Sequence, residues 1–326
     1  MHIPTIVDVL EARKTISRYL SKTSLRHNFA LSKQLAAEVY VKYENHLPTS
    51  AFKVRGGINL FSSLSRDQNQ QTVITASTGN HAQSIAYAAR LFNMRAIISM
   101  PENANPSKVE ATRSYGGEVV FHGKDFDEAR EFAERTAIEK DYRYVHSANE
   151  PLLISGVATL TLEIFEDLPD VEVIITPIGG GSMASGACIV SKALNTNTRI
   201  IGVQSENAPA AYKSWKSRSL ATDKMETFVE GLATRVGFEL PQSILRDNLH
   251  DFIVVPDQEI RNAMVTMLEA THNLPEAAGA ASLAAAIRLK DRLQGKKVAL
   301  VLSGGNISLN QLRDLLLATQ VPMQES

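Results

Sequence analysis

The chain has 326 residues, 44% of them hydrophobic and 21% charged, which is typical of a globular protein of about two domains. Its 34 basic and 35 acidic side chains leave a net charge of −1, so no basic field favours nucleic acid or an anionic membrane as a partner. The single cysteine, Cys188, excludes an internal disulfide and a multi-thiolate metal site. The N-terminus has no signal-peptide core and no apolar run reaches the ~18 residues of a membrane span, so we expect a cytoplasmic protein.

Short β-branched runs alternate with longer amphipathic segments along the chain. We predict strands at 36–43, 71–77, 95–101, 117–123, 143–147, 171–178, 198–205, 251–256 and 296–303. We predict helices at 105–116, 125–140, 257–273 and 309–320. Asn105 is a candidate N-cap before Pro106, and Gly116 is the usual left-handed stop. This alternation predicts an α/β fold with parallel sheets covered by helices on both faces.

The stretch PTSAFKVRGG (48–57) places Lys53 in an unusual setting for a lysine. Most lysines lie on solvated helix faces. Here the neighbours are small or apolar, and a Gly-Gly pair follows at Gly56 and Gly57. Desolvation lowers the pKa of an ammonium group and exposes a nucleophilic amine. The stretch therefore suggests a Schiff-base lysine, although it does not name the cofactor.

A second unusual stretch, PIGGGSMASG, follows the strand at 171–178. Gly179, Gly180 and Gly181 are followed by Ser182 and then a helix, so that backbone N–H groups and the helix N-terminus can converge on an anion. A simple tight turn is the alternative interpretation. The stretch is neither a Walker A loop nor G-x-G-x-x-G, so a single phosphate monoester fits better than a dinucleotide.

Two further strand ends carry polar side chains, and in α/β sheets ligands bind beyond such ends. The loop ASTGNHAQ brings the hydroxyl, amide and imidazole groups of residues 77–81 to a helix N-terminus, where they could hold a substrate carboxylate. An ordinary N-cap is an equally good explanation. In LSGGN, Ser303 precedes Gly304 and Gly305, and its hydroxyl either faces the ligand or simply begins a glycine-rich turn.

Together these four motifs, in this order, resemble fold-type II pyridoxal-phosphate enzymes, in the threonine/serine dehydratase and serine racemase branch. The resemblance covers about residues 5–318. It implies a fold like the β subunit of tryptophan synthase, with two open twisted α/β domains and the cofactor between them. Residues 1–71 and 150–326 would form the large cofactor-binding domain and residues 72–149 the small one. No C-terminal regulatory domain is expected, and a homodimer is the family expectation.

The resemblance also implies roles for individual residues, with pyridoxal 5′-phosphate as the cofactor. The cofactor-binding residues would be Phe52, Lys53, Asn80, Gly179, Gly180, Gly181, Ser182, Met183, Gly231 and Ser303. The substrate would contact Ser77, Thr78, Gly79, His81 and Arg130. Arg130 matches a family arginine near the substrate, but we favour a surface ion pair with Asp127 or Glu131. Glu276 could lie near the cofactor ring.

In that branch, Lys53 would hold the cofactor and then remove the Cα proton as general base. Ser303 would face the pyridine nitrogen, and a serine does not keep that nitrogen protonated, which favours fast β-elimination over transamination. Position 78 is ambiguous. Racemases carry serine there as a second acid/base and the common dehydratases carry alanine, whereas this chain has Thr78.

Some members bind a divalent cation through a Glu and an Asp. Gln204 and Ala210 occupy those positions here, so we expect no metal ion. We therefore expect elimination of water and ammonia from L-threonine or L-serine. The alternatives are a serine racemase, a dehydratase for 3-hydroxyaspartate or phenylserine, and a non-catalytic sensor of a phosphorylated ligand. A small amino acid is the expected partner, without nucleic acid or membrane.

Overall fold

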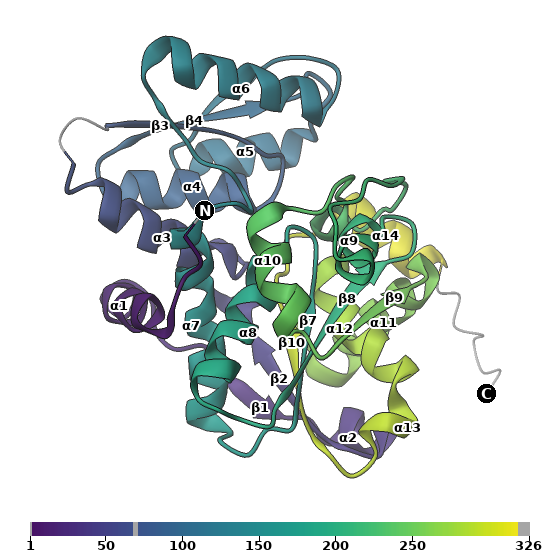
Figure 1. Cartoon of the computed structure of the whole chain (residues 1–326). Helices are drawn as coiled ribbons and strands as arrows, with labels where there is room; N and C mark the ends of the chain where they lie inside the picture. The colour runs from purple at the N-terminus through teal and green to yellow at the C-terminus, as the bar shows by residue number, and fades with distance from the viewer. Residues whose placement is uncertain (1, 68–70, 319–326) are drawn as a thin grey trace.

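The chain is built around two separate β-sheets (Figure 1). The computed structural model describes residues 2–67 and 71–318. The small sheet has the order β5-β4-β3-β6 and is parallel throughout, with β3 (Thr72–Ala76), β4 (Arg95–Met100), β5 (Glu118–Phe121) and β6 (Arg143–Tyr144). The large sheet has the order β1-β2-β10-β7-β8-β9, with β1 (Leu25–His27), β2 (Glu38–Tyr43), β7 (Val173–Pro177), β8 (Arg199–Ser205), β9 (Asp251–Val255) and β10 (Lys297–Leu302).

All nine strands predicted from the sequence are present, each trimmed by one to three residues at its ends. The strand that sequence analysis missed is β1, which pairs antiparallel with β2 at the edge of the large sheet. It spans only three residues, none of them fully buried, so no alternation of apolar and polar residues could reveal it. Every other pairing in the large sheet is parallel, as predicted.

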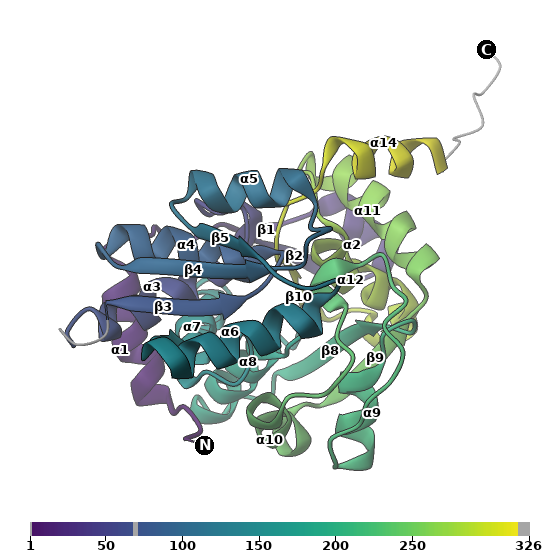
Figure 2. The ribbon, with the colours of Figure 1, turned by 90° about the horizontal axis from the view of Figure 1, so that it is seen from above.

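Helices cover both faces of each sheet. They are α1 (Ile6–Ile16), α2 (Phe29–Leu35), α3 (Lys53–Leu64), α4 (Asn80–Leu91), α5 (Pro106–Ser114), α6 (Phe126–Lys140), α7 (Pro151–Asp167), α8 (Ser182–Ala193), α9 (Ala210–Ser217), α10 (Glu239–Asn248), α11 (Asp257–Thr271), α12 (Ala277–Arg288), α13 (Lys290–Leu293) and α14 (Leu309–Ala318). Figure 2 shows the small sheet between α4 and α5 on one side and α6 on the other. Residues 319 and 320 of the last predicted helix lie outside the described residues.

The strand residues alternate between two apolar layers, as the period-2 geometry of strands requires. In β10 of the large sheet, Val298 and Leu300 pack with α11 and α12, whereas Ala299 and Val301 pack with α7 and α8. In β3 of the small sheet, Ile74 packs against α6 on the opposite face from Val73. The loops beyond the strand ends are therefore left free to form a site.

The predicted helix boundaries rest on the expected capping residues. The Asn105 side chain accepts a hydrogen bond from the Ser107 N–H at 3.0 Å, and Gly116 has the left-handed φ of +98°. The Asp125 side chain likewise accepts from the Glu128 N–H at 3.0 Å. The helix α6 thus begins and ends within one residue of the predicted range, whereas α5 ends at Ser114, two residues before the predicted end.

The two sheets use separate segments of the chain, and α3 packs against both α4 and α7 between them. The division into domains at 71 and 150 stays a prediction.

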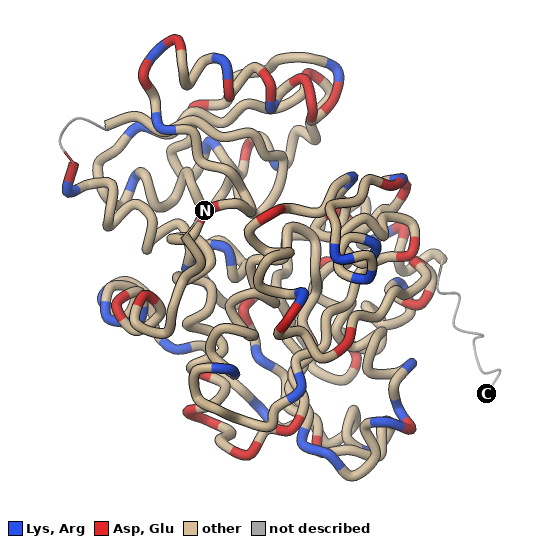
Figure 3. Tube along the Cα trace, in the orientation of Figure 1, with Lys and Arg blue, Asp and Glu red and all other residues tan. Residues whose placement is uncertain are grey.

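Acidic and basic residues alternate over both parts of the trace (Figure 3). Among the described residues, no helix has the length and apolar character needed to cross a membrane. Cys188 is buried in α8, and burial raises the pKa of its thiol to about 12.

Candidate active site

Lys53 is the first residue of α3, and its side chain points toward the glycine-rich loop that precedes α8. Its Nζ donates to the Ser182 hydroxyl at 3.4 Å and lies 5.3 Å from the ring centre of Phe52. Burial lowers the pKa of the Lys53 amine to about 8. The amine is therefore much closer to its neutral, nucleophilic form at pH 7 than a solvated lysine is.

Hydrogen bonds bring two of the sequence motifs, and the helix that follows a third, to this point. The Phe52 N–H donates to the Ser303 carbonyl at 3.0 Å, and Ala51 forms a β-bridge with Gly304. Ser303 is buried at the end of β10. The Ser84 hydroxyl of α4 donates to the Lys53 carbonyl at 2.7 Å. The backbone around Lys53 is thus fixed from both sides.

The loop between β7 and α8 has the shape of an anion cradle. Gly181 is the N-cap residue of α8 with φ +93°, a conformation that favours glycine. A Cβ atom on Gly179 would overlap the carbonyl oxygen of Gly231, so the two loops touch through their backbones. Ser182 begins the helix, and Met183 is buried behind it in the core. The positive potential of the helix N-terminus and the N–H groups of the loop suit a phosphate here.

Replacing Gly179 with alanine tests this close approach. The added methyl group must push the loops carrying Gly179 and Gly231 apart, because the overlapping atom is backbone rather than a flexible side chain. We expect the variant to fold and to bind pyridoxal phosphate at least about tenfold more weakly. Fluorescence titration with the cofactor measures the loss. Gly295→Ala is the control for general destabilisation, because its φ of +71° is strained for alanine but the added methyl group meets no atom within 4 Å and lies away from the cradle. Unchanged affinity in Gly179→Ala would contradict the cradle.

The loop 77–81 lies at the end of β3 and opens α4. The Ser77 hydroxyl accepts hydrogen bonds from the N–H groups of Gly79 at 3.2 Å and Ala82 at 3.3 Å, so it acts as a helix cap. His81 is buried and its Nε2 lies 3.1 Å from the Thr75 hydroxyl. Burial, and then the charge of Lys53, hold the pKa of His81 well below its usual range, so the ring is neutral. This leaves the half-buried Thr78 hydroxyl as the group with no described partner.

Asn80 belongs to a partly buried chain of amide and carboxyl groups. Its Nδ2 donates to Glu276 Oε1 at 2.7 Å, and its Oδ1 accepts from Asn306 Nδ2 at 2.8 Å. Burial raises the pKa of Glu276 to about 7. Sequence analysis assigned Asn80 a role and singled out Glu276, but it gave none to Asn306, although Asn306 ends the LSGGN motif.

Two predicted site residues, Gly231 and Arg130, remain to be placed. Gly231 is in a 3₁₀ turn (Glu230–Leu232) against Gly179. Arg130 pairs chiefly with Glu134, at 3.0 Å, and is 3.7 Å from Asp127, so the favoured ion-pair interpretation fits its position. Sequence analysis missed His146, which follows β6. The His146 ring packs edge-to-face against the Phe238 ring, with 5.2 Å between the ring centres. Burial, together with nearby charges that include Lys53, lowers the pKa of His146. The strand predicted at 143–147 placed His146 inside a strand, whereas β6 ends at Tyr144, so the sequence did not reveal that His146 follows a strand end.

The arrangement fits a lysine-bound cofactor with one phosphate, and the comparison of sequences agrees. The sequence profile described as "Pyridoxal-phosphate dependent enzyme" matches residues 16–304. The chain belongs to this family. It is therefore an enzyme that uses pyridoxal phosphate, and the family supplies the identity of the cofactor that the lysine and the glycine loop alone could not name.

Relatives of known name extend over nearly the whole chain. L-threonine ammonia-lyase of Thermotoga maritima is 38% identical over 309 residues, which is 94% of this chain and 77% of that protein. The catabolic L-threonine dehydratase of Staphylococcus aureus (strain USA300) is 33% identical over 320 residues, covering 97% and 92%. Maize serine racemase has a similar structure, with a TM-score of 0.91, 30% identity and coverage of 97% and 98%. This chain thus resembles both the lyases and the racemases of the family.

Proposed function

We propose that this enzyme catalyses β-elimination from a β-hydroxy amino acid, with L-threonine or L-serine as substrate. L-Threonine would yield 2-oxobutanoate and ammonia, because the water lost in the elimination is taken up again in the hydrolysis that frees ammonia. The observation that carries the proposal is the Lys53 amine, partly desolvated and aimed at the loop before α8. The named lyase relatives, at 33–38% identity, support this substrate class.

When bound, pyridoxal phosphate supplies an electron sink for the charge that develops at Cα of the substrate. The loop 179–182 and the N-terminus of α8 would hold its phosphate, and Asn80 and Ser303 would lie at the ring edge. Phe52 and Gly231 would flank the ring.

The free amine of Lys53 would take the Cα proton. A pKa of about 8 suits a general base, since the neutral form is populated near pH 7 while the amine keeps its basicity. The first N–H groups of α4, with Thr78, would hold the substrate carboxylate beside the amine. His81 would contribute through its backbone, because its ring faces Thr75.

Serine racemisation is the second candidate function, and Thr78 favours it. The Thr78 side chain is half-buried and its hydroxyl has no described hydrogen-bond partner, so it is free to exchange a proton with a substrate. A racemase needs such a group on the face opposite the lysine. The similarity to maize serine racemase supports keeping this activity in view.

The test is an absorption spectrum of the purified protein before and after L-threonine, with 2-oxo acid assayed in the same cuvette. We expect a visible band that changes while 2-oxo acid accumulates. A band without 2-oxo acid would overturn the substrate and direct the assay to D-serine formation and to bulkier β-hydroxy amino acids. Absence of any band after addition of pyridoxal phosphate would overturn the lysine-bound cofactor.

Cytoplasmic location and a homodimer complete the proposal. The single buried cysteine, which can form no internal disulfide, supports a reducing compartment. Sedimentation of the holoenzyme measures the assembly state directly.

A further inference from the structure

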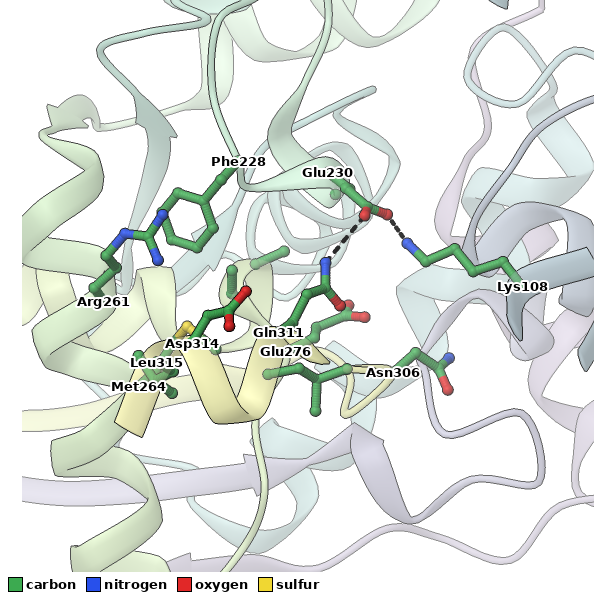
Figure 4. Close-up of a pocket in the computed structure, with 14 residues that line it drawn as sticks. Lys108, Phe228, Glu230, Arg261, Met264, Glu276, Asn306, Gln311, Asp314 and Leu315 are labelled. Carbon is green, nitrogen blue, oxygen red and sulfur yellow. Dashed lines mark hydrogen bonds and ion pairs between the residues drawn. The ribbon is translucent and has the colours of Figure 1, made fainter. Parts of the chain in front are cut away.

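Two other segments of the chain support the glycine-rich loop before α8. The first is the turn Glu230–Leu232, whose backbone meets that of Gly179. The glutamate of this turn pairs with Lys108 of α5 and accepts from Gln311 of α14 at 3.2 Å (Figure 4). The second support is the stretch 145–149 between β6 and α7, which we call the 145–149 loop. The function proposed above gives it no role.

The 145–149 loop and the start of α10 pack directly against the glycines. A Cβ atom on Gly180 would lie 3.1 Å from the Cβ atom of Ala148 and 3.9 Å from the Phe238 ring. A Cβ atom on Gly181 would lie 2.9 Å from the Cβ atom of Pro241, in the first turn of α10. The glycines therefore have little room to shift on this side, so the placement of their N–H groups depends on the loop and on α10.

Hydrogen bonds fix the 145–149 loop at both of its ends. The Asn149 side chain accepts from the Leu240 N–H at 3.1 Å, one of the N–H groups at the start of α10 that have no partner within the helix. At the other end, the Thr75 hydroxyl of β3 donates to the Val145 carbonyl at 2.7 Å. The loop thus joins the small sheet to the elements that pack on the glycines.

The His146 side chain sets the shape of the loop between these ends. Its Nδ1 lies 3.0 Å from the backbone nitrogen of Ala148 and 3.0 Å from that of Asn149. A backbone N–H group can only donate, so Nδ1 accepts both hydrogen bonds and carries no proton. The ring also packs against the Phe238 ring. His146 therefore holds the two residues through which the loop reaches Gly180 and α10.

This arrangement needs a neutral imidazole. A proton on Nδ1 would face two N–H donors, and both hydrogen bonds would break. Burial lowers the pKa of His146, and the charges of Arg130 and Lys53 act in the same direction, whereas Glu134 opposes them. The ring therefore keeps Nδ1 as an acceptor near pH 7.

We propose that His146 is a positioning residue for the cofactor phosphate. Its Nδ1 holds the backbone of Ala148 and Asn149, and these residues keep Gly180 and the start of α10 in the geometry that binds the phosphate. This role rests on the proposed function, because it requires that the loop 179–182 holds the phosphate. It does not depend on which amino acid is the substrate.

The test compares two ligands of the apoenzyme in fluorescence titrations, pyridoxal phosphate and pyridoxal, which lacks the phosphate. His146→Phe keeps an aromatic ring beside Phe238 but removes the acceptor. We expect it to bind pyridoxal phosphate about tenfold or more weakly, because two hydrogen bonds are lost, and to change the affinity for pyridoxal less than about threefold. His146→Asn keeps an oxygen that can accept from N–H groups two and three residues later, so it should restore most of the affinity.

His122→Phe is the matched control. His122 also follows a strand of the small sheet and packs on an aromatic ring, that of Phe132, but within the described chain its ring makes no hydrogen bond. Both affinities should stay unchanged in this variant. His146→Ala, which adds no volume, is measured beside His146→Phe, and urea unfolding establishes that each apoprotein is folded.

Three results would overturn the role of His146: unchanged affinity in the variants that lack the acceptor, equal losses for both ligands, or no recovery in His146→Asn. Gly179→Ala separates this failure from that of the phosphate assignment. If Gly179→Ala weakens binding of pyridoxal phosphate and the His146 variants do not, only the role of His146 is wrong. If Gly179→Ala has no effect either, the phosphate lies elsewhere. The titrations need no turnover, so they are independent of the threonine assignment.

Discussion

Lys53→Ala is expected to abolish turnover of L-threonine, with a loss of at least about 10³-fold in rate, because the variant loses both its covalent link to the cofactor and its general base. The folded protein should remain. The described polar contact of the amine is one hydrogen bond, to Ser182 at 3.4 Å, so stability depends little on it. The comparison is made by 2-oxo acid assay, with urea unfolding in parallel.

A second readout separates loss of the cofactor bond from loss of the base. Borohydride reduction fixes a lysine-bound cofactor to its peptide, and mass spectrometry should find it on the peptide containing Lys53 in the wild-type enzyme but on no peptide of Lys53→Ala. Lys33→Ala, an exposed lysine of α2, is the control and should retain both activity and the labelled peptide. Near-normal turnover by Lys53→Ala would refute the central role of this residue.

The motifs around the site could be read from the sequence because each is local. Each motif is visible within ten residues: a lysine in an apolar setting, three glycines before a helix, and a polar loop after a strand. The strands that position these motifs are recognisable from their short β-branched runs. The partners of these motifs could not be read in the same way. Asn306 meets Asn80, and Glu276 meets Asn80, across more than 190 residues of sequence. Only the packing of the two sheets brings them together.

A buried cluster of charged side chains beneath α3 could not be predicted from the sequence either, because its members come from segments that are far apart in the chain. Sequence analysis read residues 36–43 as a strand and Lys53 as the functional residue, but it gave Arg55 no role. In the structure Arg55 and Lys42 are fully buried with Glu44 and Glu163. Charged side chains are rarely buried, so composition predicts them on the surface unless the partners are known.

Arg55→Leu is expected to destabilise the protein by about 3–5 kcal/mol, because it leaves two buried carboxylates without their main cation. The Arg55 guanidinium donates to Glu44 at 2.7 Å and to Glu163 at 2.8 Å. Arg95→Leu is the matched control. Arg95 also donates to both oxygens of one carboxylate, that of Glu118, but both of these side chains are about half exposed. We expect it to cost about 0–1 kcal/mol. Urea unfolding of both variants measures the difference.

The pH dependence of stability gives an independent check on this cluster. Burial alone would raise the pKa of Glu163, but the hydrogen bonds and charges of Arg55 and Lys42 outweigh it and lower the pKa to about 2. A carboxyl whose pKa falls on folding contributes stability above its unfolded pKa, near 4.5, and loses it as the pH falls toward 2. Arg55→Leu should flatten this acid-side loss. Equal stabilities of the two arginine variants at pH 7 would contradict the argument.

The position of the cluster ties this stability to the chemistry. Arg55 lies in the first turn of α3, two residues after Lys53, and its partners come from the turn after β2 and from α7. Removing its guanidinium loosens the turn that aims the Lys53 amine at Ser182. We therefore expect Arg55→Leu to lower the rate of elimination even at temperatures where the variant is fully folded. Arg95→Leu, whose ion pair lies on the small sheet, should leave that rate unchanged.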